Sequence, residues 1–216
     1  RGYVLTREGP AQQGLSQRCE YDRIYGQDRR SRRVGRVRLG MRLLYVVGRY
    51  PSPSETFIAR EIDGLKALGA TVRVCAVEGI ARRTLLAAIA SHPPKAVALG
   101  SAMGATTSLK RRLSAAARAL VLSPQVKSID RIHAHFLGLP SMTAWCLSRL
   151  TGVPYSLTAH ARDIYVEQTP EVVLRDARFR TTCTEAAAAF LAKRLPDYPF
   201  HVVRHGIEAQ VCRAPH

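Results

Sequence analysis

The sequence predicts an α/β fold built on a doubly wound parallel sheet. Short apolar runs rich in strand-forming residues alternate with segments of helical spacing over most of the chain, and the connections between them are short. In a strand–helix–strand unit of this kind the two strands lie parallel, with a right-handed crossover. Repeated units form one sheet with helices on both faces, and ligands bind at the carboxyl ends of its strands. The residues that follow each strand are therefore the candidates for function.

Residues 1–40 differ from the rest of the chain. They have no sustained apolar period and include the charge run Arg29–Arg33, so we expect a disordered basic extension. Met41 stands immediately before the first apolar run, which indicates that the extension is not native to the domain. A basic arm that binds nucleic acid or anionic lipid is the alternative interpretation. We place the domain at 41–208 and expect 209–216 to begin an interdomain linker.

The first strand–helix–strand unit begins at 42–47, a strand rich in Leu, Tyr and Val. Ser52 and Glu55 match a capping box with proline in the first helical position, so we expect a helix with Ser52 as its N-cap. The apolar residues of this helix recur at helical spacing up to Gly69, a natural stop. A second strand at 71–77 completes the unit.

The same alternation continues to the end of the domain. Helices are expected where apolar residues recur every three or four positions, and strands where short apolar runs stand between turn residues. The expected elements are a helix at 81–90, a strand at 96–99, a helix at 109–122, a strand at 131–136, a helix at 140–150, strands at 153–159 and 179–183, a helix at 184–195 and a strand at 200–203.

Composition narrows the class of protein. The 33 Lys and Arg exceed the 16 Asp and Glu by 17, a balance that often indicates nucleic acid or an anionic membrane as partner. The charge is spread along the chain and no recognition motif accompanies it, so nucleic acid is not the expected partner. The five cysteines are far apart, which argues against a zinc cage or a disulfide framework. With no membrane-length apolar run and no secretory signal, a cytoplasmic location is expected.

The end of the first strand leads into the loop 49–56, which contains Ser54, Glu55 and Thr56. Unpaired amides at the start of the following helix favour an anion such as a phosphate. A well-capped helix start without a ligand is the alternative. Only Gly48 is present there, so the glycine-rich dinucleotide fingerprint is missing and neither NAD nor FAD is expected.

Two histidines, His133 and His135, stand two residues apart on an expected strand. They therefore point to the same face of the sheet, where a pair of imidazoles can hold a metal ion. The available partners are Asp130, His160 and Asp163. The alternative is that both histidines hydrogen-bond a neighbouring loop.

A third strand end, in the segment 156–164, carries an imidazole, a guanidinium and a carboxylate within four residues: His160, Arg162 and Asp163. A buried strand does not require such a cluster at the edge where ligands bind. An Arg–Asp ion pair, with Asp163 capping a helix, is the alternative interpretation.

Four segments, in order, resemble successive motifs of the family-4 glycosyltransferases, in the branch that builds exopolysaccharide and colanic acid. They are Ser54-Glu55-Thr56-Phe57-Ile58 with Glu61-Ile62 and Leu65, then His133-Ala134-His135-Phe136, then 156–164, then Arg204-His205-Gly206-Ile207-Glu208. The resemblance covers about 41–208. It implies a Rossmann-like domain that forms the N-terminal, acceptor-side half of a GT-B fold.

The resemblance also implies an activity. A sugar would move, with retention of configuration, from a nucleotide-sugar donor to a glycan or polyprenyl-linked acceptor, without a cofactor or a metal. His160 would be the catalytic residue, hydrogen-bonding a sugar hydroxyl beside an oxocarbenium-like transition state. The substrate-binding residues would be Ser54, Glu55, Thr56, His133, His135, Arg162, Asp163 and Gly206. The basic stretch 108–113 either lies on an anionic membrane, at the inner face of the plasma membrane, or is a solvated helix face.

Departures from the family pattern qualify this expectation. His205 and Glu208 stand where relatives usually have Asn and Asp. The pair of glutamates eight positions apart that contacts the donor in relatives is not in this sequence, so we expect the donor domain to be absent and the truncated chain to be inactive alone. Two other functions remain open: a metal-dependent hydrolase that uses the two strand histidines, and a non-catalytic basic binding module.

Overall fold

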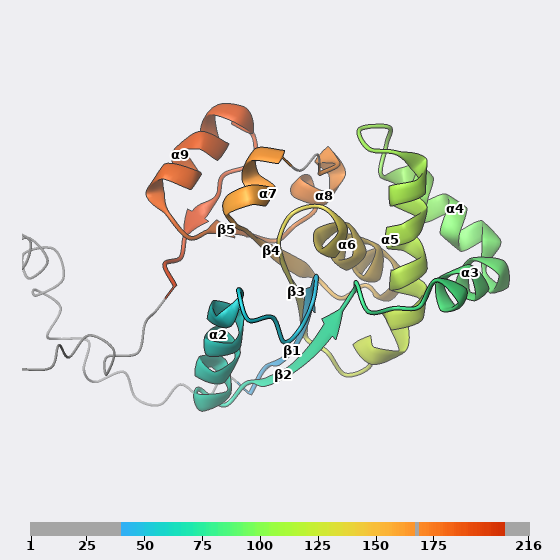
Figure 1. Cartoon of the computed structure of the whole chain (residues 1–216), viewed down its shortest axis with the longest axis horizontal. Helices are drawn as coiled ribbons and strands as arrows, with labels where there is room; N and C mark the ends of the chain where they lie inside the picture. Colours follow the sequence, from blue (N-terminus) through green and yellow to red (C-terminus); the bar gives the residue numbers. More distant parts are fainter. Residues whose placement is uncertain (1–39, 167–168, 206–216) are drawn as a thin grey trace, which may run out of the picture. The chain divides into compact units, whose positions relative to one another are not determined.

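The computed structural model describes residues 40–166 and 169–205, which form a parallel sheet with helices on both faces (Figure 1). The sheet has six strands in the order β2-β1-β3-β4-β5-β6, and every neighbouring pair is parallel. The strands are β1 (Arg42–Val47), β2 (Thr71–Ala76), β3 (Arg131–His135), β4 (Tyr155–Ala159), β5 (Arg180–Thr182) and β6 (His201–Val202). The predicted α/β class with a doubly wound, Rossmann-like parallel sheet is confirmed.

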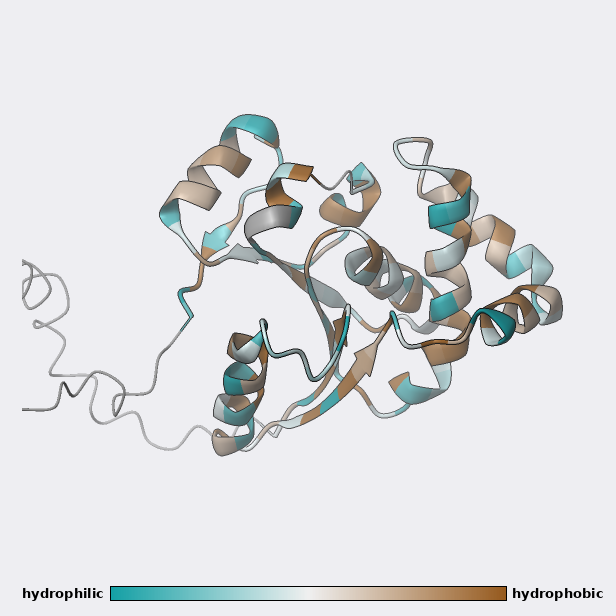
Figure 2. Cartoon of the chain, in the orientation of Figure 1, coloured by the Kyte–Doolittle hydropathy of each residue, from teal (hydrophilic) through white to brown (hydrophobic). Residues whose placement is uncertain are grey.

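The helices connect these strands. They are α2 (Thr56–Ala67), α3 (Arg82–Ser91), α4 (Pro93–Ala102), α5 (Leu109–Leu122), α6 (Leu139–Thr151), α7 (Ala161–Val166), α8 (Glu171–Arg175) and α9 (Glu185–Arg194). Several carry both hydrophilic and hydrophobic turns (Figure 2), as expected for helices with one face on a sheet and one in water. A short 3₁₀ helix, Ser123–Val126, follows α5.

Two hydrophobic clusters cover the two faces of the sheet. On one face, Tyr45 of β1 packs with Ile58 and Ile62 of α2. On the other, Leu44 of β1 belongs to a larger cluster that includes Trp145 of α6 and residues of α5. Because successive side chains of a strand point to opposite faces, the apolar run of β1 supplies both clusters. This agrees with the place of β1 inside the sheet, between β2 and β3.

The chain order places a switch point between β1 and β3. From β1 the chain crosses to β2 on one side and then returns to β3 on the other. In the register, Tyr45 of β1 pairs with His133 of β3, and His133 pairs with Ser156 of β4. In doubly wound sheets, ligands bind outside the carboxyl ends of the strands at such a switch point. The strand ends near Val47 and His135 are thus the place to search.

Two sequence-based expectations about elements were wrong. The first helix begins at Thr56, with Glu55 in the N-cap position and no side-chain cap, so the expected capping box at Ser52 does not form. Instead, the amide of Glu55 donates to the carbonyl of Ser52 across a turn, at 3.1 Å. Residues 52–55 therefore form a separate turn, and α2 begins only after it.

The second error is the strand expected at 96–99, which lies inside α4. Pro93 begins this helix, in a position where the missing amide costs nothing. The buried residues Ala96, Leu99 and Gly100 recur at helical spacing, and a Cβ on Gly100 would lie 3.1 Å from the Leu113 side chain of α5. The apolar triplet thus fits a helix packed closely on a helix. Helices α7 and α8 are not among the predicted elements, although the alternative interpretation of Asp163 implied a helix near α7.

The helices expected at 109–122 and 140–150 agree with α5 and α6. Ser108 caps α5 by accepting from the amide of Arg111, and Gly152 ends α6 with a left-handed backbone, φ 76°. In the basic stretch before and within α5, Arg112 donates to the carbonyl of Gly100 at 3.1 Å, so part of its charge serves a contact within the protein. Within 40–166 and 169–205, no helix is long and apolar enough to cross a membrane. The expectations for 1–39 and 206–216 concern residues outside the described part of the chain.

Candidate functional site

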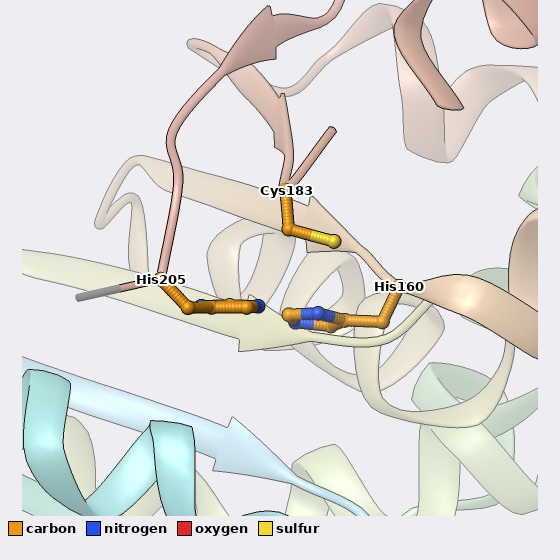
Figure 3. Close-up of side chains that lie close together, drawn as sticks. All are labelled: His160, Cys183 and His205. Carbon is orange, nitrogen blue, oxygen red and sulfur yellow. The ribbon is translucent and has the colours of Figure 1, made fainter. Parts of the chain in front are cut away.

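Three ligand-type side chains meet at the carboxyl edge of the sheet (Figure 3). His160 follows β4, Cys183 follows β5, and His205 lies three residues beyond β6. One nitrogen or sulfur atom from each lies within 4.8 Å of the others. We call this group of three residues the outer cluster. It forms because β4, β5 and β6 are parallel neighbours, so that their ends reach the same edge.

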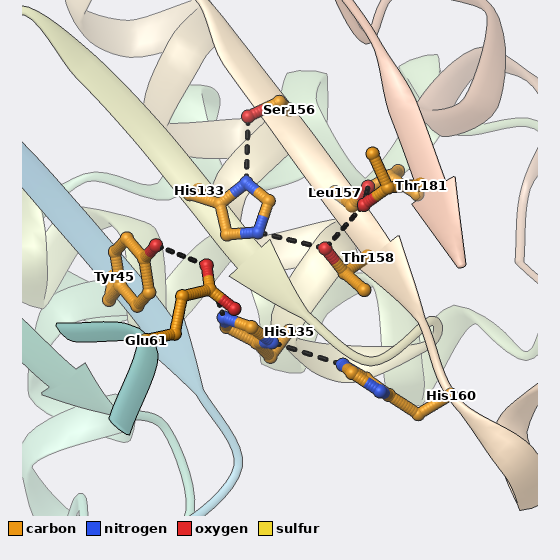
Figure 4. Close-up of polar contacts among 9 residues, drawn as sticks. All are labelled: Tyr45, Glu61, His133, His135, Ser156, Leu157, Thr158, His160 and Thr181. Atoms are coloured by element: carbon orange, nitrogen blue, oxygen red, sulfur yellow. Dashed lines mark hydrogen bonds and ion pairs between the residues drawn. The ribbon is translucent and has the colours of Figure 1, made fainter. Parts of the chain in front are cut away.

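A second group of polar residues lies on the face of the sheet, on β3, β4 and β5 (Figure 4). His133 of β3 pairs through Nδ1 with the hydroxyl of Ser156 at 2.8 Å and through Nε2 with that of Thr158 at 3.0 Å. Thr158 in turn pairs with Thr181 of β5, hydroxyl to hydroxyl, at 2.6 Å. We call these four residues the inner cluster. Both ring nitrogens of its histidine are occupied by protein partners.

His135 connects the two groups. Its Nδ1 pairs with Nε2 of His160 at 3.0 Å, so one of the two nitrogens donates to the other. Its Nε2 lies 3.7 Å from Oε1 of Glu61 on α2, beyond hydrogen-bond distance, and has no hydrogen-bond partner although it is buried. The hydroxyl of Tyr45 donates to the same Glu61 oxygen at 2.5 Å. A row of polar groups thus runs from Tyr45 and Glu61 through His135 to His160 (Figure 4).

The buried histidines are uncharged near neutral pH. Burial lowers the pKa of His133 to about 4. Burial lowers the pKa of His160 to about 3, with smaller electrostatic contributions from the neighbouring His205 and His133. Burial also lowers the pKa of His135 well below its usual value, with contributions from the three other histidines. A neutral imidazole has one donor and one acceptor nitrogen, so these rings can hydrogen-bond or ligate without releasing a proton.

Aromatic rings hold His160 in place. Phe57, in the first turn of α2, lies 4.7 Å from the His160 ring and 4.3 Å from the His205 ring, centre to centre. Phe136 lies 4.7 Å from His160 and has a left-handed backbone, φ 75°, which is uncommon for an aromatic residue. The rings of His160 and His205 stack at 5.3 Å. The imidazole edge of the outer cluster is therefore walled by two phenylalanines from different segments.

Asp163 supports the loops of this edge. Its Oδ1 accepts from the amide of His160 at 2.8 Å, and its Oδ2 accepts from the amide of Leu137. Burial raises the pKa of this carboxyl to about 6, and the hydrogen bonds from backbone amides oppose the rise. Both oxygens serve the chain itself, so Asp163 positions the exits of β3 and β4.

The metal set expected from the sequence is not assembled. Of its members, His133 has both nitrogens in hydrogen bonds, and Asp163 has both oxygens on amides. Asp130 pairs with Arg42, Oδ1 to Nη2, at 2.8 Å, and these residues border the amino ends of β3 and β1. The expectation that the strand histidines share one face is correct, but the four-residue hydrolase site does not follow from it.

The loop residues expected to bind substrate lie beside the ends of β1 and β2. The hydroxyls of Ser54 and Ser52 are 3.2 Å apart, and Thr56 begins α2. Burial raises the pKa of Glu55, and the negative charge of Glu78 adds to the rise. Phe57 links this loop to the outer cluster. The side chain of Arg162 and all of Gly206 lie outside the described part of the chain.

A cavity of about 700 Å³ lies on the sheet face between α2 and the chain that follows β6. Its wall includes His133, Ser156 and Thr158 from the inner cluster and His205 from the outer cluster. Large apolar side chains from the strands and α2 supply much of the remaining wall, among them Leu43, Tyr45, Phe57, Leu65 and Phe179. A concave, apolar wall with a few polar groups is typical of small-molecule sites.

Several residues of this region were not selected from the sequence. Tyr45, Glu61, Cys183 and His205 were not assigned a role, although Glu61 and His205 stood within segments that the family resemblance used. The available signal was position: Cys183 is the last residue of one expected strand, and His205 lies two residues after another. What the sequence did not supply was the strand order, which brings these two exits together.

No family model matches the sequence, and no curated protein matches it. Among solved structures, the chain is similar to UDP-GlcNAc 2-epimerase from Neisseria meningitidis bound to UDP-GlcNAc, with a TM-score of 0.46 and 15% sequence identity. The match covers 75% of this chain and 45% of the epimerase chain, so this chain spans less than half of the length of that protein. A likeness of this degree carries no argument about substrate or mechanism.

Proposed function

We propose that this chain is the acceptor-side domain of a retaining glycosyltransferase, which moves a sugar from a nucleotide-sugar donor to a glycan or polyprenyl-linked acceptor. The observation that carries the proposal is the placement of His160. It is a neutral imidazole at the carboxyl end of β4, walled by Phe57 and Phe136. It stands beside the switch point of a doubly wound sheet, where ligands of such folds bind.

The chemistry of this edge suits a sugar. Nε2 of His160 is paired with His135, so Nδ1 is the nitrogen left to form a hydrogen bond with a sugar hydroxyl, which can donate or accept. The adjoining cavity of about 700 Å³ is large enough for a short saccharide and falls in the usual range for small-molecule sites. Fixed dipoles placed beside a sugar ring stabilise positive charge as the glycosidic bond to the nucleotide breaks. His160 is the catalytic residue of this proposal, and Asp163 is a positioning residue.

The proposal divides the work between two lobes. The described domain would hold the acceptor, while a second lobe would bind the nucleotide of the donor. Because both lobes must close on the donor for reaction, we expect the described domain to bind saccharide and not to transfer sugar alone. Contact with an anionic membrane, through the basic start of α5, belongs to the same proposal.

The test is saturation-transfer NMR on the full chain with a panel of oligosaccharides and nucleotide-sugars. We expect an oligosaccharide to receive saturation, and His160→Ala to weaken its binding at least tenfold, about 1.4 kcal/mol. His160→Gln, which keeps a hydrogen-bonding side chain, should retain part of the affinity. His92→Ala is the matched control, because His92 is an exposed histidine next to α4.

Two results would contradict the proposal. One is that no member of the panel receives saturation at millimolar concentration. The other is that His160→Ala, with unchanged thermal unfolding, binds the saccharide as tightly as the wild type. Either would remove the sugar contact on which the assignment of His160 depends.

A further inference from the structure

We propose that the outer cluster is a binding site for one divalent transition-metal ion of the zinc class, with His160, Cys183 and His205 as its protein ligands. One ligand atom from each residue lies within 4.8 Å of the other two. Ligands of a single tetrahedral zinc lie about 3.3–3.6 Å apart, given metal–ligand bonds of ~2.0–2.3 Å. In this proposal, side-chain rotation on binding closes the difference. The inference goes beyond the proposed function, since it requires neither a saccharide nor sugar transfer.

The backbone supports such a site from three independent positions. His160, Cys183 and His205 follow β4, β5 and β6, which are successive neighbours in the sheet. His160 and Cys183 directly follow strands whose hydrogen bonds fix their starting points, and His205 lies three residues beyond β6. Figure 3 shows the three side chains pointing toward one another from separate segments. Ligands held on sheet ends are placed more precisely than ligands on one loop.

The outer cluster differs from a second group of ligand-type residues in that its ligand atoms are not occupied by hydrogen bonds. One ligand-type atom each from Glu61, His133 and His135 also lies within 4.8 Å of the others. There, however, His133 has both nitrogens in hydrogen bonds, and Glu61 accepts from Tyr45. A metal at that place would have to displace these partners.

In the outer cluster the ligand atoms are available. Cys183 is a free cysteine, and within 40–166 and 169–205 neither its thiol nor the ring of His205 forms a hydrogen bond. His160 pairs through Nε2 with His135 and keeps Nδ1 for a metal. Ligating histidines usually hold a hydrogen bond through their second nitrogen, which fixes the ring. His135 supplies that bond here.

The donor set selects the ion. One thiolate and two imidazoles suit a borderline-soft cation such as Zn²⁺, whereas Mg²⁺ and Ca²⁺ prefer oxygen. Binding displaces the proton of the Cys183 thiol into solvent and needs no oxidant or reductant. Three protein ligands leave a fourth position for water or a substrate hydroxyl. The ion would fasten the segment after β6 to the ends of β4 and β5.

The experiment titrates the full-length reduced chain, first stripped with a chelator, with Zn²⁺ alone in competition with a chromogenic chelator. We expect one tight site, which Cys183→Ser and His205→Asn each weaken at least a hundredfold. With Co²⁺ as a second probe, we expect a thiolate-to-cobalt charge-transfer absorption that Cys183→Ser abolishes. Cys75→Ser and His92→Asn are the matched controls, and both should bind zinc as the wild type does.

Three results would overturn the inference. They are the absence of a tight zinc site, a site that survives both ligand substitutions, or a Co²⁺ spectrum without thiolate absorption. Circular dichroism of each variant excludes loss of fold as the cause of weakened binding. The saccharide test is separate: zinc binding without saccharide binding would leave this inference standing and remove the proposed function, and the reverse result would do the opposite.

Discussion

The two groups of histidine-centred residues at the end of the sheet differ in one property. In the inner cluster, both ring nitrogens of His133 form hydrogen bonds with the hydroxyls of Ser156 and Thr158. In the outer cluster, the rings of His160 and His205 stack at 5.3 Å beside Cys183, and bonding positions remain unused. Buried polar groups that are fully paired stabilise a fold. Groups with unused capacity at a strand end are where a ligand can bind, so the same residue type serves structure in one place and function in the other.

The largest effect should come from the residue that supports the outer cluster. Asp163→Ala leaves the amides of Leu137 and His160 without their carboxylate acceptor. Buried amides that lose a charged partner cost about 1–3 kcal/mol each, so the free energy of unfolding should fall by about 4 kcal/mol in a urea titration. Asp163→Asn, which keeps one acceptor oxygen, should lose about half as much. Equal losses in the two variants would contradict the assigned role.

Loss of a histidine should destabilise the fold more in the inner cluster than in the outer cluster. His133→Ala leaves two buried hydroxyls without their partner and creates a cavity, so it should lower the free energy of unfolding by about 2–4 kcal/mol. His205→Ala, at a half-buried position with no such hydrogen bond among the described residues, should lower it by less than about 1 kcal/mol. Chemical denaturation of both variants measures the contrast. Similar losses would remove the distinction between the clusters.

The pH dependence of stability should report His133. Its pKa is about 4 in the folded chain against 6.5 as the usual value, so between these values the unfolded chain binds the proton more readily. Stability is therefore complete above pH 6.5 and decreases as the pH falls toward 4, by about 3 kcal/mol at ~1.4 kcal/mol per pH unit. His133→Asn should lose this part of the slope, while groups such as Asp163 titrate in both proteins. Identical slopes would show that His133 does not contribute.

The smallest effect concerns the hydroxyl that links β4 to its neighbours. Thr158→Val keeps the shape of the side chain but removes the partner of His133 Nε2 and of Thr181. We expect a loss of about 1–2 kcal/mol in the free energy of unfolding. Zinc affinity should remain within twofold of the wild type, because the outer cluster is untouched. A large loss of zinc affinity would mean that the clusters act as one unit.

The fold was largely accessible from the sequence, because its strands are short, apolar and bounded by turn residues. The two wrong predictions, the strand at 96–99 and the capping box at Ser52, concern segments whose residue pattern is compatible with more than one structure. The apolar run at 96–99 fits either element, and Pro93 together with contact to α5 favours a helix. Ser52 is a plausible N-cap residue, but it begins a turn that is separate from the helix. The helix therefore begins later, at Thr56. Neither choice can be made from spacing alone.

The site was accessible only in part. The two-residue spacing of His133 and His135 correctly placed both on one face, because this follows from strand geometry. That His160 would meet Cys183 and His205 depends on the order of β4, β5 and β6, which is a property of the whole sheet. The role of Asp163 likewise depends on an amide of Leu137, in a separate loop. Contacts between distant segments carry the information that the linear pattern lacks.

One measurement tests the central claim that the outer cluster is the ligand-binding group and the inner cluster is structural. It follows the imidazole nitrogen resonances of the full chain by NMR while Zn²⁺ and an oligosaccharide are added in separate titrations. The account predicts that the resonances of His160 and His205 shift on addition of zinc while those of His133 stay unchanged, and that His160 shifts with the saccharide. A shift of His133 with His160 and His205 unmoved would contradict it.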